Sequence, residues 1–115
     1  MLITATMDPR VLMEGMLNGS VVAMTGKKHA QGKVRYDLFP VHAEEWINKV
    51  LTHGAEKYGD DNWRFVEDAD RHYYSAARRH LEARRKGEVM DPETGMPHLA
   101  HAICSLIFLL EIDQL

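Results

Sequence analysis

The stretch that most constrains the fold runs from Leu99 to Ile112 and reads LAHAICSLIFLLEI. Apart from His101 and Ser105, every residue before Glu111 is apolar, which is typical of a helix buried in a core. The run is too short to cross a bilayer, because a membrane-spanning helix needs about 20 apolar residues. The body of the chain shows no alternation typical of strands. The sequence therefore predicts an all-α fold organised around this segment.

Two further helices are expected before the apolar one. In the first, Trp46 and Val50 recur at helical spacing, and in the second Tyr73 and Leu81 lie on one stripe. Gly87 is expected to end the second helix. The prediction is a compact bundle of about three main helices, at about residues 41–57, 70–86 and 97–112.

The N-terminal part of the chain is expected to lie outside this bundle. Residues 1–31 are predicted to form an extension or loop with one short helical element, between Asp8 and Gly19. Residues 32–115 are predicted to form the helical domain. The chain has 115 residues, which is the size of one ordinary domain.

Charge and cysteine content narrow the function classes. The formal net charge is −3, which argues against a general nucleic-acid binder, since those are usually basic. The single cysteine, Cys104, suits a reducing compartment and is expected to be inert core packing. No secretion signal or membrane span is found, so a cytoplasmic protein is expected.

Two histidines, His98 and His101, open the apolar helix and lie within about 60° of one another on its surface. A buried imidazole without a partner costs about 1–3 kcal/mol. Either packed carboxylates or carbonyls satisfy both rings, or the rings bind a divalent metal ion. His80 precedes them on the neighbouring helix, and Glu88 and Asp91 lie in the ten-residue loop between the two helices.

Antiparallel packing of these two helices would bring the loop carboxylates and the imidazoles together. Imidazoles combined with carboxylates suit Mn, Co, Ni or Zn, whereas Mg and Ca prefer oxygen ligands. The candidate metal ligands are His80, Glu88, Asp91, His98 and His101.

A second polar group consists of cations, an amide and aromatic rings. Such residues bind nucleotides, with the phosphates on Lys or Arg and the base on an aromatic face. The alternative is a solvated basic surface with a core tryptophan. The candidate substrate-binding residues are Lys33, Arg35, Lys57, Tyr58, Asn62, Trp63 and Arg79.

Four segments in order carry a resemblance to a known family: GKVRYDLFP, GAEKYGDDNW, RRHLEARRKGEVMDPETG and HLAHAICSLIFLLE. Together they resemble the phage-type dATP/dGTP diphosphohydrolase (N-terminal domain) family over roughly residues 32–112. The resemblance implies hydrolysis of purine deoxynucleoside triphosphates, dGTP or dATP, to the monophosphate and diphosphate. It also implies a nucleoside triphosphate as partner, a homo-oligomer (dimer or tetramer), and the host cytoplasm as location. Neither nucleic acid nor a membrane is expected as a partner.

That family in turn resembles the all-α nucleoside triphosphate pyrophosphohydrolases of the MazG and dimeric dUTPase type. Those enzymes hold Mg ions with an E-E-x-x-E helix and a later E-x-x-D. Here EEWIN (Glu44, Glu45, Asn48) resembles the first motif, and HLAH stands at the place of the second.

The resemblance implies a divalent metal (Mg, Mn or Co) and a catalytic role for Glu45, which would orient or deprotonate the attacking water. The alternative is a non-catalytic phage protein that binds or sequesters a nucleotide in the same pocket.

Overall fold

The computed structural model describes residues 26–115, and contacts divide the chain into two units with the boundary between Arg35 and Tyr36. The short helix expected between Asp8 and Gly19 lies outside the described residues. In the described part of the first unit, a turn is closed by the Lys33 N–H, which donates to the Ala30 carbonyl at 3.1 Å. The boundary expected from the sequence, before residue 32, lies four residues earlier.

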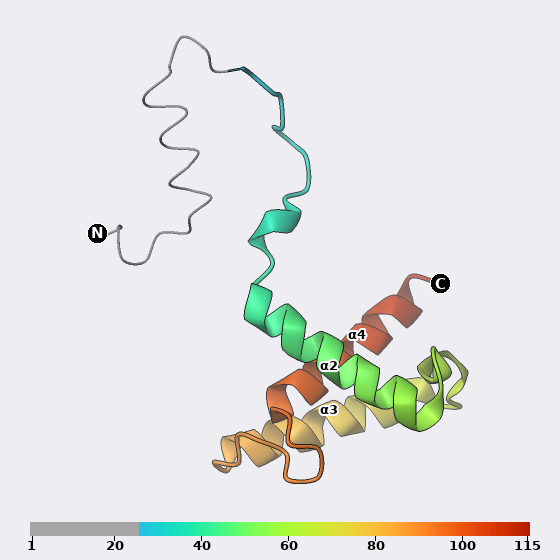
Figure 1. The fold of residues 1–115 in the computed structure, drawn as a ribbon. Helices are drawn as coiled ribbons and strands as arrows, with labels where there is room; N and C mark the ends of the chain where they lie inside the picture. Colours follow the sequence, from blue (N-terminus) through green and yellow to red (C-terminus); the bar gives the residue numbers. More distant parts are fainter. Residues whose placement is uncertain (1–25) are drawn as a thin grey trace. The chain divides into compact units, whose positions relative to one another are not determined.

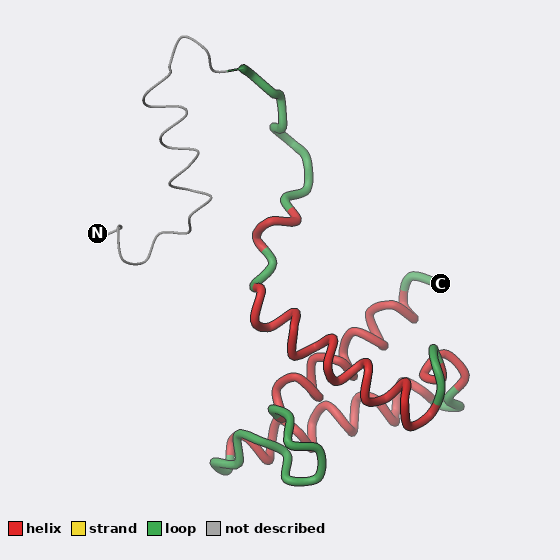
Figure 2. Tube along the Cα trace, in the orientation of Figure 1, coloured by secondary structure: helices red, strands yellow, loops and turns green. Residues whose placement is uncertain are grey.

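The second unit is all-α, as the sequence predicts (Figures 1 and 2). Within the described residues no strand is formed, and a single isolated bridge joins Met90 to Pro97. The long helices begin and end within one residue of the expected positions. The elements are η2 (Tyr36–Leu38), α2 (Val41–Tyr58), η3 (Asn62–Phe65), α3 (Ala69–Arg85) and α4 (His98–Asp113).

Prolines set the starts of α2 and α4. Pro40 and Pro97 are the N-caps, with ψ values of 124° and 136°, so the chain is extended immediately before each helix. Proline has a fixed φ and no N–H, so it ends an incoming helical hydrogen-bond ladder but leaves a following helix free to begin. Because Pro97 is the cap, α4 begins at His98, and this histidine lies in the first turn.

Gly87 ends α3, as the sequence predicts. Its φ of 105° is left-handed, and its N–H donates to the Arg84 carbonyl at 2.9 Å. The N–H of Glu88 donates to the Ala83 carbonyl at 3.1 Å, which completes a Schellman motif. This pair of bonds fixes the direction in which the chain leaves α3, and so it positions Glu88.

The core lies where α4 packs against both α2 and α3 (Figure 1). Apart from Ile47 on α2, the buried apolar residues there are small, with Ala77 on α3 and Ala100, Ala102 and Cys104 on α4, so the helices approach closely. The Cys104 thiol lies 3.6 Å from the Ile47 carbonyl oxygen on α2, and burial raises the pKa of this thiol to about 11. The thiol is therefore protonated at neutral pH, in keeping with a packing role.

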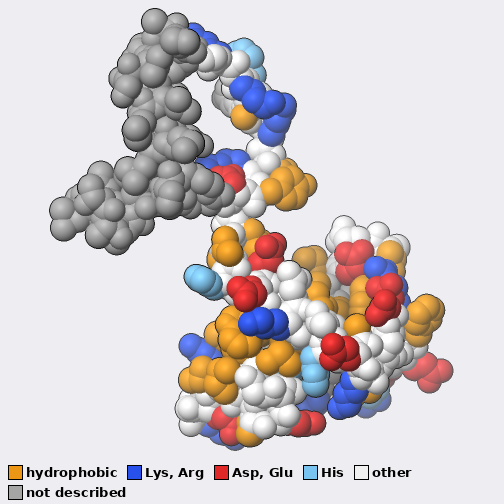
Figure 3. Space-filling model, viewed as in Figure 1, with side chains coloured by type: hydrophobic (Ala, Val, Ile, Leu, Met, Phe, Trp, Pro, Cys, Tyr) orange, Lys and Arg blue, Asp and Glu red, His pale blue; other side chains and the backbone are white. Residues whose placement is uncertain are grey.

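The surface of the helical unit is mixed. On the face shown in Figure 3, acidic, basic and hydrophobic side chains are interspersed. Among the helices of residues 26–115, none combines the length and the apolar character that crossing a membrane requires.

Candidate metal centre and its surroundings

The loop between α3 and α4 is held by its own hydrogen bonds. The Asp91 N–H donates to the Met96 carbonyl at 2.8 Å, and the His98 N–H donates to the Val89 carbonyl at 2.9 Å. The Oδ1 atom of Asp91 accepts from the Glu93 N–H at 2.9 Å, which forms an Asx turn. The Asp91 carboxylate is therefore fixed, and the residue is only 8% exposed.

His80 of α3 and His98 of α4 face each other at this loop. Their Nδ1 atoms lie 2.9 Å apart, and His98 is 4% exposed. Two ring nitrogens at this distance share one proton, since two N–H groups pointing at each other would repel. A cation that replaces that proton would meet a nitrogen lone pair from each ring.

Glu88 holds His98 from the opposite side of its ring. Its Oε1 atom lies 2.8 Å from the His98 Nε2 atom, and the Glu88 side chain is half-exposed. A carboxylate that accepts from Nε2–H leaves Nδ1 as the free lone pair, which is the arrangement found behind metal-binding histidines. Glu88 is thus positioned to orient the His98 ring, because its carboxylate contacts Nε2, the ring nitrogen that does not face His80.

His101 lies next to the pair. Its ring stacks on that of His80 with centroids 4.6 Å apart, and its Nε2 atom is 2.7 Å from the Thr94 hydroxyl oxygen. The same Nε2 atom is 3.7 Å from the Asp91 Oδ2 atom. His101 therefore packs against the pair and carries a hydrogen bond of its own to the loop.

Burial favours the neutral form of two of these rings. It is the main cause that lowers the pKa of His80 below its usual value, and the nearby His101 and His98 rings add to this effect. Burial also lowers the pKa of His101, against an opposing effect of Asp91. A neutral ring has a nitrogen lone pair, which metal binding requires.

The donor atoms of His80, Asp91 and His98 fit a divalent ion. One ligand atom from each of the three residues lies within 4.8 Å of the other two. Two nitrogens bound at about 2.1 Å would be about 3.0 Å apart in an octahedral shell and about 3.4 Å apart in a tetrahedral one, so the observed Nδ1–Nδ1 distance of 2.9 Å is closer to the octahedral value. Of the five residues predicted as ligands, the structure brings these three together and places Glu88 and His101 beside them.

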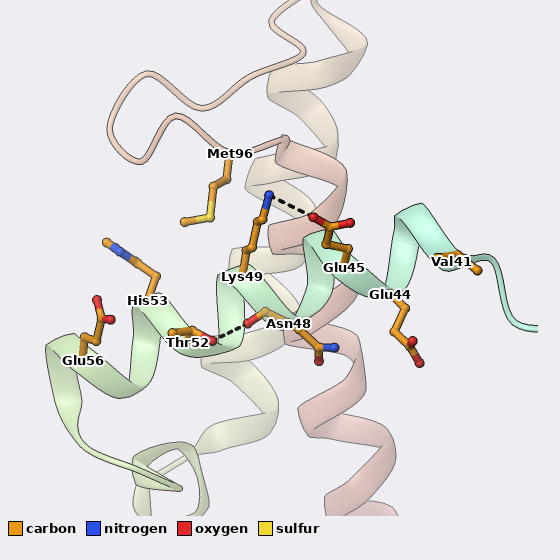
Figure 4. Close-up of a pocket in the computed structure, with 9 residues that line it drawn as sticks. All are labelled: Val41, Glu44, Glu45, Asn48, Lys49, Thr52, His53, Glu56 and Met96. Atoms are coloured by element: carbon orange, nitrogen blue, oxygen red, sulfur yellow. Dashed lines mark hydrogen bonds and ion pairs between the residues drawn. The ribbon is translucent and has the colours of Figure 1, made fainter.

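Glu45, the predicted catalytic residue, lies in a groove of about 620 Å³ along α2 (Figure 4). Its carboxylate pairs with the Lys49 ammonium at 3.3 Å, and both side chains are more than half exposed. Met96 of the loop also lines this groove, so the groove extends to the segment that carries Asp91. Figure 4 shows Glu44 and Asn48 pointing away from the Glu45–Lys49 pair.

The predicted phosphate-binding and base-binding residues are dispersed. Arg79 lies on α3 in a groove of about 730 Å³ that is also lined by Arg78, Lys86 and Glu88, so it is close to the metal centre. Lys57 lies over the ring of Tyr58 at the end of α2. Asn62 begins η3. Lys33 and Arg35 belong to the first unit, and their roles stay predictions.

Trp63 packs away from the histidines. Its ring stacks on Phe108 at 4.8 Å, and the Arg64 guanidinium lies over it. Phe108 is ten residues after His98, or about 15 Å along α4. The structure thus favours the alternative that Trp63 packs within the protein, over the prediction that its ring binds the nucleotide.

The structure adds residues that the sequence did not single out. Thr94 bonds to His101, and His53 lies close enough to His101 to lower its pKa. Thr94 lies in a Thr-Gly turn, which was recognised only as a helix breaker. Lys86, the C-cap residue of α3, lies seven positions after Arg79, which is about two helical turns, and could have been found by that spacing.

The sequence of this chain is similar to known proteins over most of its length. A family model described as dATP/dGTP diphosphohydrolase, N-terminal, matches residues 23–115. A protein of Salmonella phage PMBT28 named dATP/dGTP diphosphohydrolase is 36% identical over 86 residues, which are 75% of this chain and 29% of that protein. The chain thus spans less than a third of the length of this relative. No solved structure matches the chain.

Proposed function

The chain belongs to the dATP/dGTP diphosphohydrolase N-terminal family, and on this premise we propose that it hydrolyses purine deoxynucleoside triphosphates to the monophosphate and diphosphate. The proposal includes a divalent metal ion held by His80, Asp91 and His98. The phage relative carries the activity in its name, and its likeness to this chain extends over 86 residues, which are 75% of the chain.

The observation that carries the metal assignment is the pair of Nδ1 atoms 2.9 Å apart beside a buried carboxylate. Two nitrogens and one oxygen are a donor set that suits Mn or Co better than Mg. A bound divalent ion would offset the negative charge of the phosphate oxygens and acidify a nearby water.

Residues of this chain would prepare the site in defined ways. Glu88 fixes the His98 ring through Nε2, and the Asx turn at Asp91 fixes the carboxylate. His101 restrains His80 by stacking. These contacts hold the donor atoms in place before substrate binds, which lowers the cost of ordering them.

Positive charge for the phosphates is available beside the centre. Arg78, Arg79 and Lys86 line one groove with Glu88, and Glu88 in turn contacts His98. Arginine binds phosphate oxygens through paired N–H groups, and lysine does so as a point charge. We assign the triphosphate to this groove on α3.

Glu45 remains the proposed group that orients or deprotonates the attacking water. Its groove extends to Met96, at the loop that carries Asp91. In this role Glu45 must leave Lys49, and both side chains are exposed enough to move. Exposed ion pairs of this kind contribute about 0.3–0.5 kcal/mol, so separating them costs little.

The direct test is chromatography of the products from a panel of ribo- and deoxynucleoside triphosphates, each with Mg, Mn or Co. We expect diphosphate and a deoxynucleoside monophosphate, dependent on the metal and lost with a chelator. The His98→Ala variant should lose activity while its circular dichroism stays helical. Full activity in that variant would refute the metal assignment.

A nucleotide-binding protein without catalysis is the second candidate, and the pairing of Glu45 with Lys49 favours it. Incubation with dGTP and Mn, followed by heat denaturation, separates the two functions. Release of intact dGTP in an amount equal to the protein would support the binder, whereas release of dGMP and diphosphate would support the hydrolase.

A further inference from the structure

Thr94 makes two hydrogen bonds in the loop between α3 and α4. The Met96 N–H donates to its hydroxyl oxygen at 3.2 Å, and the same oxygen lies 2.7 Å from the Nε2 atom of His101. Because this oxygen already accepts the Met96 N–H, its own proton is available for Nε2. A hydroxyl group that donates to Nε2 occupies the lone pair with which the His101 ring could bind a metal, and it leaves the ring proton on Nδ1.

His101 lies close enough to the metal centre to serve as a further ligand. Its ring is within 14° of parallel to the His80 ring, and its Nε2 atom is 3.7 Å from the Asp91 Oδ2 atom. Two atoms bound to one ion at about 2.1 Å are about 3.0 Å apart when adjacent in an octahedral shell and about 4.2 Å apart when opposite. The distance of 3.7 Å lies within this range, so a small turn of His101 would bring Nε2 to an ion bound at Asp91.

The donor set of the structure nevertheless leaves His101 out. The donor atoms within 4.8 Å of one another belong to His80, Asp91 and His98. The Nδ1 atoms of His80 and His98 face each other at 2.9 Å, whereas the His101 Nε2 atom faces the Thr94 hydroxyl group. Three protein ligands leave positions on an ion for other groups, as catalytic sites do, whereas four protein ligands are typical of closed structural sites.

We propose that Thr94 is a positioning residue, which keeps His101 out of the coordination shell so that the metal centre stays open to a phosphate oxygen and a water. The proposal rests on the metal-dependent hydrolysis proposed above. It adds that a single hydroxyl group sets the number of protein ligands, because the His101 Nε2 atom is free to bind the ion only when that group is absent.

Removal of the hydroxyl group should therefore tighten metal binding, whereas loss of a purely structural contact would weaken it. Thr94→Val has nearly the shape of threonine but no hydroxyl group. We expect its affinity for Co, measured by calorimetric titration, to rise by about tenfold, the lower end of the effects that partners of metal-binding histidines have. Hydrolysis of dGTP by this variant should be slower in spite of the tighter binding, because His101 fills a position that the substrate or water needs.

Proton NMR of the Co-loaded protein counts the bound imidazoles directly. An imidazole that binds paramagnetic Co through one nitrogen gives a strongly shifted, solvent-exchangeable signal from the N–H of its other nitrogen. The unmodified chain should show such signals from His80 and His98, and Thr94→Val should show a third, from His101. Water-proton relaxation by the Mn-loaded protein should fall in the same variant, because His101 replaces a water.

Three further variants serve as matched controls. Thr94→Ser keeps the hydroxyl group and should match the unmodified chain in Co affinity and in the number of shifted signals. Thr94→Ala lacks the hydroxyl group, as Thr94→Val does, and should also show the third signal. Thr94→Val combined with His101→Gln should lose both that signal and the gain in affinity. Circular dichroism of each variant shows whether the helices are retained.

The outcomes separate the role of Thr94 from the metal centre on which it depends. Failure of the unmodified chain to bind Co would refute the metal centre, and the role of Thr94 with it. If the unmodified chain binds Co but neither Thr94→Val nor Thr94→Ala shows a third signal, the role of Thr94 is refuted and the metal centre stands. Weaker Co binding by both variants would have the same meaning.

Discussion

The Nδ1 atoms of His80 and His98 lie 2.9 Å apart, although 18 residues separate them in the sequence. The contact exists because the Schellman motif at Gly87 turns the chain and the hydrogen-bonded loop returns it to the start of α4. Neither ring alone would indicate a binding site. Their meeting beside Asp91 is what gives the helical unit a set of metal donors.

Metal binding should depend on His80 and not on a neighbouring histidine of the same helix. We expect His80→Ala to abolish the rise in melting temperature that Mn or Co gives the unmodified protein, because one of two nitrogen donors is lost. A ligand at 100 times its Kd stabilises a protein by about 2.7 kcal/mol, which a thermal melt detects readily.

The control for this experiment is His72→Ala, since His72 is an exposed histidine on α3. This variant should respond to the metal like the unmodified chain. An equal loss of response in both variants would mean that the metal acts nonspecifically.

Removing Glu88 should weaken metal binding without removing a donor. Glu88→Ala takes away the acceptor at the His98 Nε2 atom, so the ring is free to turn and change tautomer. Loss of such a partner typically costs 10–100-fold in metal affinity. Calorimetric titration with Co measures this, with Glu82→Ala as the control, because the Glu82 carboxylate pairs with the exposed Arg85. Unchanged affinity in Glu88→Ala would show that this carboxylate does not orient the ring.

The helices could be predicted because their causes are local. Apolar spacing, the prolines at 40 and 97, and Gly87 are visible in the sequence, and the observed bounds differ by about one residue. The convergence of His80, Asp91 and His98 depends also on antiparallel packing of α3 and α4. The sequence does not establish this packing, so the metal site could be predicted only on the assumption that the helices pack in this way.

Other features of the site depend on tertiary contacts that no local pattern shows. The position of Trp63 is set by stacking on Phe108, a residue 45 positions away in the chain. Thr94 reaches His101 only because the loop folds back on itself. A tryptophan within a polar turn looks the same in sequence whether it packs inward or contacts a ligand.

Stability should fall as the solution is acidified below about pH 6.5. Burial lowers the pKa of both His80 and His101 in the folded protein, whereas an unfolded chain binds these protons near pH 6.5. Between the folded and unfolded pKa values the unfolded state binds more protons, so the free energy of unfolding decreases as pH falls. Urea denaturation at pH 7.5, 6.5 and 5.5 measures the trend.

A variant isolates the part of this trend that His101 contributes. His101→Gln keeps a hydrogen-bonding side chain but cannot take up the proton, so its stability should depend less steeply on pH over the same interval. An equal slope in the variant would mean that other groups cause the acid sensitivity.

Trp63 should matter for stability and not for nucleotide affinity. We expect Trp63→Ala to lower the free energy of unfolding by about 2 kcal/mol, less than for a fully buried tryptophan, because the side chain is only partly buried. Phe108→Leu should have a smaller effect of the same kind, since it removes the other ring of the stack. Urea denaturation and the KM for dGTP separate the two roles. A raised KM with unchanged stability would mean that Trp63 contacts the substrate.

Two glycines should respond to alanine with opposite signs. Gly87 has a φ of 105°, where an L side chain is strained, so Gly87→Ala should destabilise the protein by about 1–2 kcal/mol. Gly54 lies inside α2 in the helical conformation, and alanine there should stabilise by about 0.5–1 kcal/mol. A Cβ atom at either position would meet no heavy atom within 4 Å, so packing does not decide the result.

Because Gly87 positions Glu88, Gly87→Ala should also weaken Co binding, while Gly54→Ala should leave it unchanged. Equal effects of the two substitutions on Co affinity would show that the end of α3 does not control the metal centre.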